Sequence, residues 1–101
     1  MAPSQAERVA IVTGGSAGIG LHTALGLAGR GMQVVLVGRD PGRTERERRL
    51  VAERSGSQRI TALVADFASL AAVRQLAETI LAEHPRIDVL INNAGLISPH
   101  L

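Results

Sequence analysis

The sequence predicts an α/β fold, a Rossmann-type doubly wound parallel sheet with four strands and three helices in the order βαβαβαβ. Two observations predict it. Four short segments are almost wholly aliphatic, and three longer segments with helical features lie between them. Strands without polar alternation are typical of a parallel sheet that is covered on both faces. Right-handed crossovers between such strands wind the helices around the sheet.

The strands are predicted where Val, Ile, Leu and Ala dominate, over residues 9–13, 33–37, 60–65 and 89–92. The first helix is predicted over 18–30. Its Leu21, Leu25 and Ala28 would share one face, and Gly29 and Gly31 would end it.

The second helix is predicted over 41–54, because Pro41 suits a first helical turn and the pair Ser55-Gly56 suits a helix exit. The arginines in it are expected to face solvent, offset by two glutamates: Arg43, Arg46, Arg48 and Arg49, with Glu45 and Glu47.

The third helix is predicted over 69–83, with Ser69 as its N-cap and Pro85 after its end. An apolar stripe is expected to face the sheet. Its members are Leu70, Val73, Leu76, Ala77, Ile80 and Leu81.

Composition excludes several classes of function. A chain of 101 residues forms one domain at most. All 11 basic residues are arginine, yet the net charge is only +2, so a general affinity for nucleic acid does not follow. Without cysteine there are no disulfides or thiolate metal sites, and the three histidines lack metal-ligand spacing. The aliphatic runs are too short to span a bilayer. We expect a soluble cytoplasmic protein without a metal or membrane site.

A glycine-rich run joins the first strand to the first helix, at positions 13–20. Glycines let a pyrophosphate approach the unpaired N–H groups and positive dipole end of a helix N-terminus. The strand–loop–helix context favours this interpretation over a tight turn without a ligand. Ser16 would add a hydroxyl donor, and the Thr13 hydroxyl would orient the loop. The expected cofactor-binding residues here are Thr13, Gly14, Ser16, Gly18, Ile19 and Gly20.

The spacing Thr-Gly-x-x-x-Gly-x-Gly is not the commonest Rossmann fingerprint. Together with Asp66-Phe67 after the third strand and Asn-Asn-Ala-Gly at 92–95, it closely resembles the short-chain dehydrogenase/reductase family. The segments Val-Gly-Arg-Asp at 37–40 and Asp-Phe-Ala-Ser-Leu at 66–70 look most like the retinol-dehydrogenase-like branch of that family. The resemblance covers residues 9–95. It implies an NAD(P)-dependent oxidoreductase that transfers hydride between the cofactor and an alcohol or carbonyl substrate.

The resemblance also implies roles for residues after the third and fourth strands. The Asp66 carboxylate would accept a hydrogen bond from the adenine amino group, and the Phe67 N–H would face the ring; the alternative is that Asp66 caps the third helix. Asn92 would stabilise the sheet beside the adenosine, and Gly95, after Ala94, would let the backbone pass close to the cofactor. The alternative for the two asparagines is that they only form a turn.

The turn after the second strand bears on the choice of cofactor. An NAD-binding domain usually carries an acid there for the ribose hydroxyls, whereas an NADP-binding domain uses Arg for the 2′-phosphate. Gly38 occupies the position of the acid, and Arg39 follows. We therefore expect NADP. NAD remains the alternative, because Asp40 could still reach a ribose hydroxyl.

Catalysis in this family uses a Ser and a Tyr-x-x-x-Lys pair downstream, and the chain contains neither Tyr nor Lys. No catalytic residue is assigned. We expect 1–101 to be a partial cofactor-binding domain, inactive alone, with a substrate only in a complete protein. The fourth strand would lie at an open sheet edge, which invites self-association. The alternative function is a non-catalytic dinucleotide-binding module acting as a sensor or interaction protein; methyltransferase-like nucleotide binding fits the motifs less well.

Overall fold

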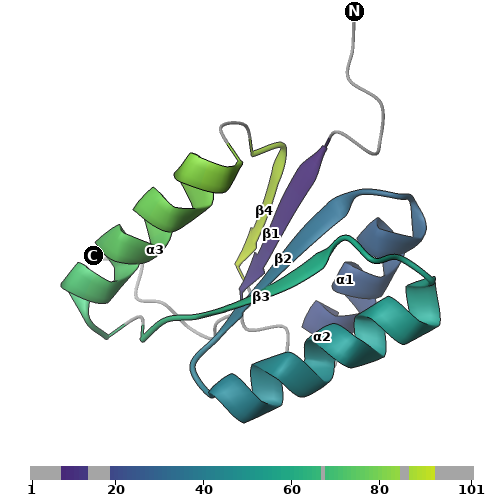
Figure 1. Ribbon diagram of the computed structural model, residues 1–101, viewed down its shortest axis with the longest axis horizontal. Coiled ribbons are helices and arrows are strands. Elements are labelled where there is room, and N and C mark those ends of the chain that lie inside the picture. The colour runs from purple at the N-terminus through teal and green to yellow at the C-terminus, as the bar shows by residue number, and fades with distance from the viewer. Residues whose placement is uncertain (1–7, 14–18, 67, 85–86, 93–101) are drawn as a thin grey trace, which may run out of the picture.

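The computed structural model describes residues 8–13, 19–66, 68–84 and 87–92. Within them lies an alternating series of strands and helices (Figure 1). The elements are β1 (Val9–Thr13), α1 (Ile19–Gly29), β2 (Gln33–Gly38), α2 (Pro41–Ser55), β3 (Ile60–Val64), α3 (Leu70–Glu83) and β4 (Val89–Asn92). The predicted fold class and element order are confirmed. Bounds differ from the prediction by one residue at most.

Local signals set the ends of the helices. Asp40 caps α2 from extended backbone, and its side chain accepts a hydrogen bond from the Gly42 N–H. Gly56 ends α2 in the left-handed region at φ 73°, with its N–H donating to the Ala52 carbonyl. The Ser69 side chain caps α3 by accepting from the Ala72 N–H, as predicted.

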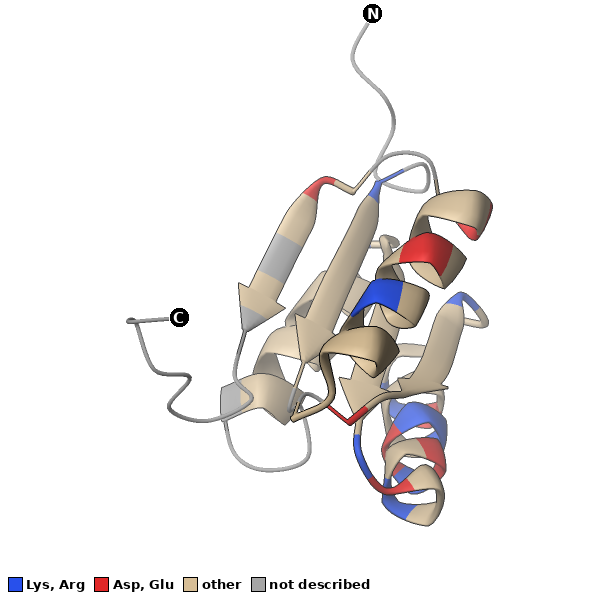
Figure 2. Ribbon diagram, turned by 90° about the vertical axis from the view of Figure 1, so that its left-hand side faces the viewer, with Lys and Arg blue, Asp and Glu red and all other residues tan. Residues whose placement is uncertain are grey.

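The sheet has the order β3-β2-β1-β4, with all pairs parallel. Thr13 is opposite Val37 in β2 and Asn92 in β4, and Gly38 is opposite Val64. The arrowheads of the strands point the same way (Figure 2). All four strands therefore end at one edge of the sheet, which we call the carboxyl edge.

Both faces of the sheet are covered, by α1 and α2 on one side and by α3 on the other (Figure 1). Along β1, Ala10 and Val12 alternate with Val9 and Ile11, and all of them are buried. That arrangement explains the lack of polar alternation in the strand sequences. The core toward α1 and α2 consists of Val12, Ala24, Ala28, Val34, Leu36, Val51 and Ile60.

The contact face of α1 differs in part from the prediction. Ala28 is buried as expected, and among the side chains of α1 that the structure describes Ala24 is buried too, while Leu21 and Leu25 are half-buried at the margin of the core. Small residues at the centre of the face let the helix lie close to the sheet, and the larger leucines then pack around that contact.

The apolar stripe of α3 is narrower than predicted. Ile80 is buried and Leu76 packs beside it, but Leu70 is 68% exposed and Leu81 52% exposed. One helix resting on a sheet buries only the line of side chains that points at it, so apolar residues to either side stay in solvent. None of the helices in the described ranges is long and apolar enough to cross a membrane.

The left-handed cap at Gly56 generates a stability prediction. We expect Gly56→Ala to lower the free energy of unfolding by about 1 kcal/mol, because a Cβ disfavours this backbone region. The control is Gly26→Ala within α1, where nothing lies within 4 Å of an added Cβ. It should raise the free energy by about 0.5–1 kcal/mol. Urea unfolding measures both. Equal effects of the two substitutions would contradict the cap.

Candidate functional site

The carboxyl edge gathers the polar residues that follow the strands. Arg39 comes directly after β2, and Asp66 comes two residues after β3. The Ala65 N–H donates to the Gly38 carbonyl at 3.0 Å, which continues the β2–β3 pairing beyond the end of β3. In open α/β sheets, ligands bind in the crevice outside the carboxyl ends of the strands.

The structure describes about half of the residues predicted for this site. Thr13, Ile19, Gly20, Arg39, Asp66 and Asn92 are described. Gly14, Ser16, Gly18, Phe67, Ala94 and Gly95 lie outside the described residues.

Thr13 links β1 to β4 at the carboxyl edge through a side-chain hydrogen bond. It is 7% exposed, and its hydroxyl donates to the Ile91 carbonyl at 3.4 Å. The predicted role was to orient the glycine-rich run, which lies outside the described residues; the contact seen here is with β4. β1 ends at Thr13 and α1 begins at Ile19, and the first turn of α1 includes the buried Gly20.

The β2–α2 turn separates the two charged residues that bear on cofactor choice. Arg39 is exposed. Asp40 is the N-cap of α2: its Oδ1 accepts from the Gly42 N–H at 3.2 Å. A capping carboxylate is directed at the helix N-terminus. The acid considered as a ribose ligand therefore has a structural role in this turn.

Thr44 also shapes the β2–α2 turn, and the sequence reasoning missed it. It is buried, and its hydroxyl donates to the Asp40 carbonyl at 2.7 Å. A Cβ added to Gly38 would collide with that hydroxyl. A threonine four residues after a capping Asp could have indicated the hydrogen bond, but nothing in the sequence indicates the contact with Gly38.

Asp66 is held in a turn before α3 but does not cap it. Its Oδ1 accepts from the Ala68 N–H at 2.9 Å, and its carbonyl accepts from the Ser69 N–H at 3.0 Å. The N-cap of α3 is Ser69. The interpretation of Asp66 as a helix cap is therefore wrong, and its exposed carboxylate stays at the carboxyl edge.

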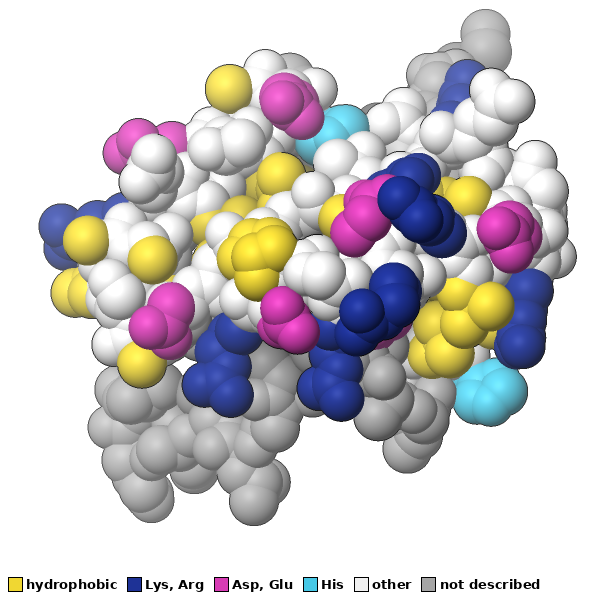
Figure 3. Space-filling view, turned by 60° about the horizontal axis from the view of Figure 1, so that its bottom comes forward, with side chains coloured by type: hydrophobic (Ala, Val, Ile, Leu, Met, Phe, Trp, Pro, Cys, Tyr) yellow, Lys and Arg dark blue, Asp and Glu magenta, His cyan; other side chains and the backbone are white. Residues whose placement is uncertain are grey.

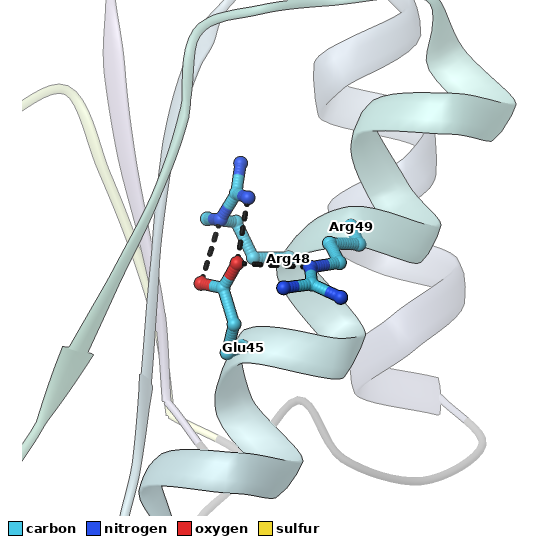
Figure 4. Close-up of polar contacts among 3 residues, drawn as sticks. All are labelled: Glu45, Arg48 and Arg49. Carbon is cyan, nitrogen blue, oxygen red and sulfur yellow. Dashed lines mark hydrogen bonds and ion pairs between the residues drawn. The ribbon is translucent and has the colours of Figure 1, made fainter.

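Ion pairs within α2 offset part of its positive charge. Glu45 accepts from Arg48 through both oxygens, at 2.8 and 2.7 Å, and from the Arg49 Nε at 3.2 Å (Figure 4). Basic and acidic side chains are interleaved on the side of the molecule that carries α2 (Figure 3). The predicted offset of arginines by glutamates is seen at Glu45, although Arg48 is only half-exposed.

The pKa values of Glu45 and Glu47 are shifted in opposite directions. The hydrogen bond from Arg48, helped by Arg49, lowers the pKa of Glu45 to about 2. Partial burial raises the pKa of Glu47 above its ordinary value, against the opposing influence of Arg43 and Arg46. The described part of the chain contains no group of three His, Cys, Asp or Glu that could hold a metal ion.

Comparison with known proteins identifies the family. The family model for short chain dehydrogenase matches residues 8–101, so the chain belongs to the short-chain dehydrogenase/reductase family. The predicted resemblance, including its retinol-dehydrogenase-like character, is confirmed. The chain is 45% identical over 91 residues to human dehydrogenase/reductase SDR family member 13, covering 90% of this chain and 24% of that protein. It is 39% identical to human retinol dehydrogenase 13, covering 97% and 31%.

Solved structures give the same fold. Menthone neomenthol reductase from Mentha piperita superposes with a TM-score of 0.81 at 35% identity, over 88% of this chain and 32% of that one. A short chain dehydrogenase from Shigella flexneri complexed with NADP gives 0.78 at 31% identity, over 90% and 38%. An NAD+-bound xylitol dehydrogenase gives 0.80 at 33%, over 89% and 34%. The chain thus spans less than half of the length of each of these five proteins.

The opposite pKa shifts of Glu45 and Glu47 can be measured. A carboxyl NMR titration should give Glu45 a pKa of about 2 and Glu47 a pKa above 4.5. Because the pKa of Glu45 is lowered by folding, its stabilising contribution is present above pH 4.5 and is lost as the pH falls toward 2.

Arg48→Gln should return the pKa of Glu45 toward 4.5, and Arg49→Gln should move it less, because Arg48 makes the larger contribution. A Glu45 pKa near 4.5 in the unmodified protein would show that the bidentate pair does not form in solution.

Proposed function

We propose that this chain is the NADP-binding part of an oxidoreductase that transfers hydride between NADP(H) and an alcohol or carbonyl substrate. The carrying observation is the carboxyl edge, where the exposed Arg39 follows β2 and the exposed Asp66 follows β3. Membership of the short-chain dehydrogenase/reductase family supports the dinucleotide as the ligand of this edge.

The pyrophosphate is proposed to bind where β1 leads into α1. Gly14 and Gly18 would admit the phosphates, and Ser16 would donate a hydroxyl hydrogen bond. The first turn of α1, at Ile19 and Gly20, supplies unpaired N–H groups and the positive end of a helix dipole.

The adenosine is proposed to lie over the ends of β3 and β4. Asp66 would accept a hydrogen bond from the adenine amino group, and the Phe67 N–H would face the ring. Asn92 would hold the sheet beside the adenosine, followed by Ala94 and Gly95 close to the cofactor. The hydrogen bond from Ala68 fixes the Asp66 carboxylate for this role through one oxygen.

The proposal favours NADP over NAD because of the β2–α2 turn. Gly38 offers no carboxylate to the ribose hydroxyls, and the carboxylate of Asp40 caps α2. Arg39 is an exposed cation in this turn, and a guanidinium pairs well with the 2′-phosphate that distinguishes NADP. When bound, the nicotinamide cofactor supplies the hydride chemistry; this chain binds and orients it.

A second candidate is a dinucleotide-binding module without turnover, acting as a sensor or interaction protein. Both candidates use the same dinucleotide site, since the residues that catalyse hydride transfer in this family lie downstream of the motifs that this chain carries. In either case the 101 residues are proposed to be inactive alone. The outer edge of β4, which pairs only with β1 among the described strands, is proposed as a surface for self-association. A stable cofactor complex of the whole protein without turnover of alcohols or carbonyls would favour the second candidate.

Arg39→Ala tests the cofactor assignment. Losing a charged hydrogen-bonded pair costs about 1.5–3 kcal/mol, so the Kd for NADP should rise about tenfold to a hundredfold, while the Kd for NAD stays within about twofold. Isothermal titration calorimetry measures both constants. The control is Arg30→Ala, an exposed arginine before β2 at the opposite edge of the sheet. Equal losses for the two cofactors, or tighter binding of NAD by the unmodified protein, would overturn the assignment.

A further inference from the structure

The contact between Gly38 and Thr44 joins the last residue of β2 to the end of the first turn of α2. Thr44 is 4% exposed. Its hydroxyl and its N–H both donate to the Asp40 carbonyl, at 2.7 and 2.9 Å. A Cβ at position 38 would collide with the Thr44 Oγ1 and would lie 3.5 Å from its Cβ. The Thr44 side chain thus occupies the space that any side chain at position 38 would need.

Close approach, and not backbone conformation, calls for glycine at this position. Among the described glycines, positive φ is found at Gly31 and Gly56, and Gly38 is not one of them. Every L-residue can adopt the backbone that Gly38 has. Among the described residues, the three atoms nearest to a Cβ at position 38 all belong to Thr44, and only its Oγ1 is too close, so it is this hydroxyl that disfavours a Cβ there.

Neither partner of the contact can move without losing hydrogen bonds. Gly38 is paired with Val64 in the sheet, and its carbonyl accepts from the Ala65 N–H. Rotating the Thr44 side chain to clear the space would break its hydroxyl bond to the Asp40 carbonyl. Because Asp40 also caps α2, a displacement of the turn would disturb the start of that helix.

We infer that Thr44 is a specificity-determining residue, which excludes a side chain at position 38 and thereby keeps an acid away from the ribose hydroxyls. An acid at the end of the second strand is what selects NAD in dinucleotide-binding folds. Because Thr44 leaves no room for an acid at position 38, Arg39 is the charged residue of this turn that is free to bind at the 2′ position of the ribose. The inference rests on the proposed function and adds a residue that would not itself touch the cofactor.

The packing claim is tested first, without any cofactor. Gly38→Ala should shift urea unfolding of the protein to lower denaturant, whereas in a Thr44→Ala background the same change should be neutral or stabilising, because glycine in a strand is otherwise unfavourable. The coupling in this double-mutant cycle should be at least tenfold in the unfolding equilibrium constant. No coupling would overturn the inference.

Thr44→Val separates volume from hydrogen bonding. Valine removes the hydroxyl but keeps a γ carbon in the space that the Cβ of residue 38 would need. Thr44→Val should therefore not relieve the destabilisation caused by Gly38→Ala. Relief by valine equal to relief by alanine would overturn the claim. If the Gly38→Ala protein does not fold, we compare the double variants that combine it with Thr44→Ala or with Thr44→Val. Folding of the Thr44→Ala double variant alone supports exclusion by the volume of the Thr44 side chain. Failure of both double variants to fold overturns it.

The specificity claim is tested by titration with NADP and NAD. Gly38→Asp alone should weaken the binding of both NADP and NAD without inverting the ratio of their Kd values. Gly38→Asp with Thr44→Ala should move that ratio toward NAD by at least tenfold. Inversion by Gly38→Asp alone would overturn the role of Thr44. Unmodified protein that binds neither nucleotide would overturn the proposed function and the specificity role with it, whereas the stability cycle would still decide whether Thr44 closes position 38.

Discussion

Parallel pairing of β1 with both of its neighbours is the constraint on which the other features depend. The pairing with β4 is fixed at both ends. At its start the Asp88 carboxylate accepts from the Val9 N–H at 2.9 Å, and the Asp88 N–H donates to the Val9 carbonyl. At its end Thr13 donates to Ile91. A slip of one residue would turn every buried side chain to the opposite face, and it would also break up the carboxyl edge.

The fold follows closely from the sequence because its determinants are local or compositional. Strands buried on both faces must be aliphatic throughout, so their positions can be read directly. Helix ends carry their own signals: Pro41, Gly56 and Ser69 all act where the sequence predicts. With alternating elements, right-handed crossovers leave few arrangements of the sheet.

The candidate site follows less completely, because its details depend on distances between side chains. Sequence reasoning could place Arg39 and Asp66 after their strands and could identify Ser69 as the cap of α3, but it left a capping role open for Asp66 and did not show that Asp40 caps α2. The exposure of Leu70 and Leu81 could not be predicted from the sequence, because the identity of an apolar residue does not show whether its side chain faces the sheet or the solvent. Thr44 matters through a contact across a turn, which no pattern of residue types records.

Amide NMR during an NADP titration shows whether the dinucleotide binds at the carboxyl edge. We expect the perturbed amides to be those after the ends of β1, β2, β3 and β4, with Arg39 and Asp66 among them. Amides at the opposite edge, around Arg30 and Arg59, should not change. Saturable changes centred on Arg30 and Arg59, with none near Arg39 and Asp66, would mean that the dinucleotide does not bind at the carboxyl edge.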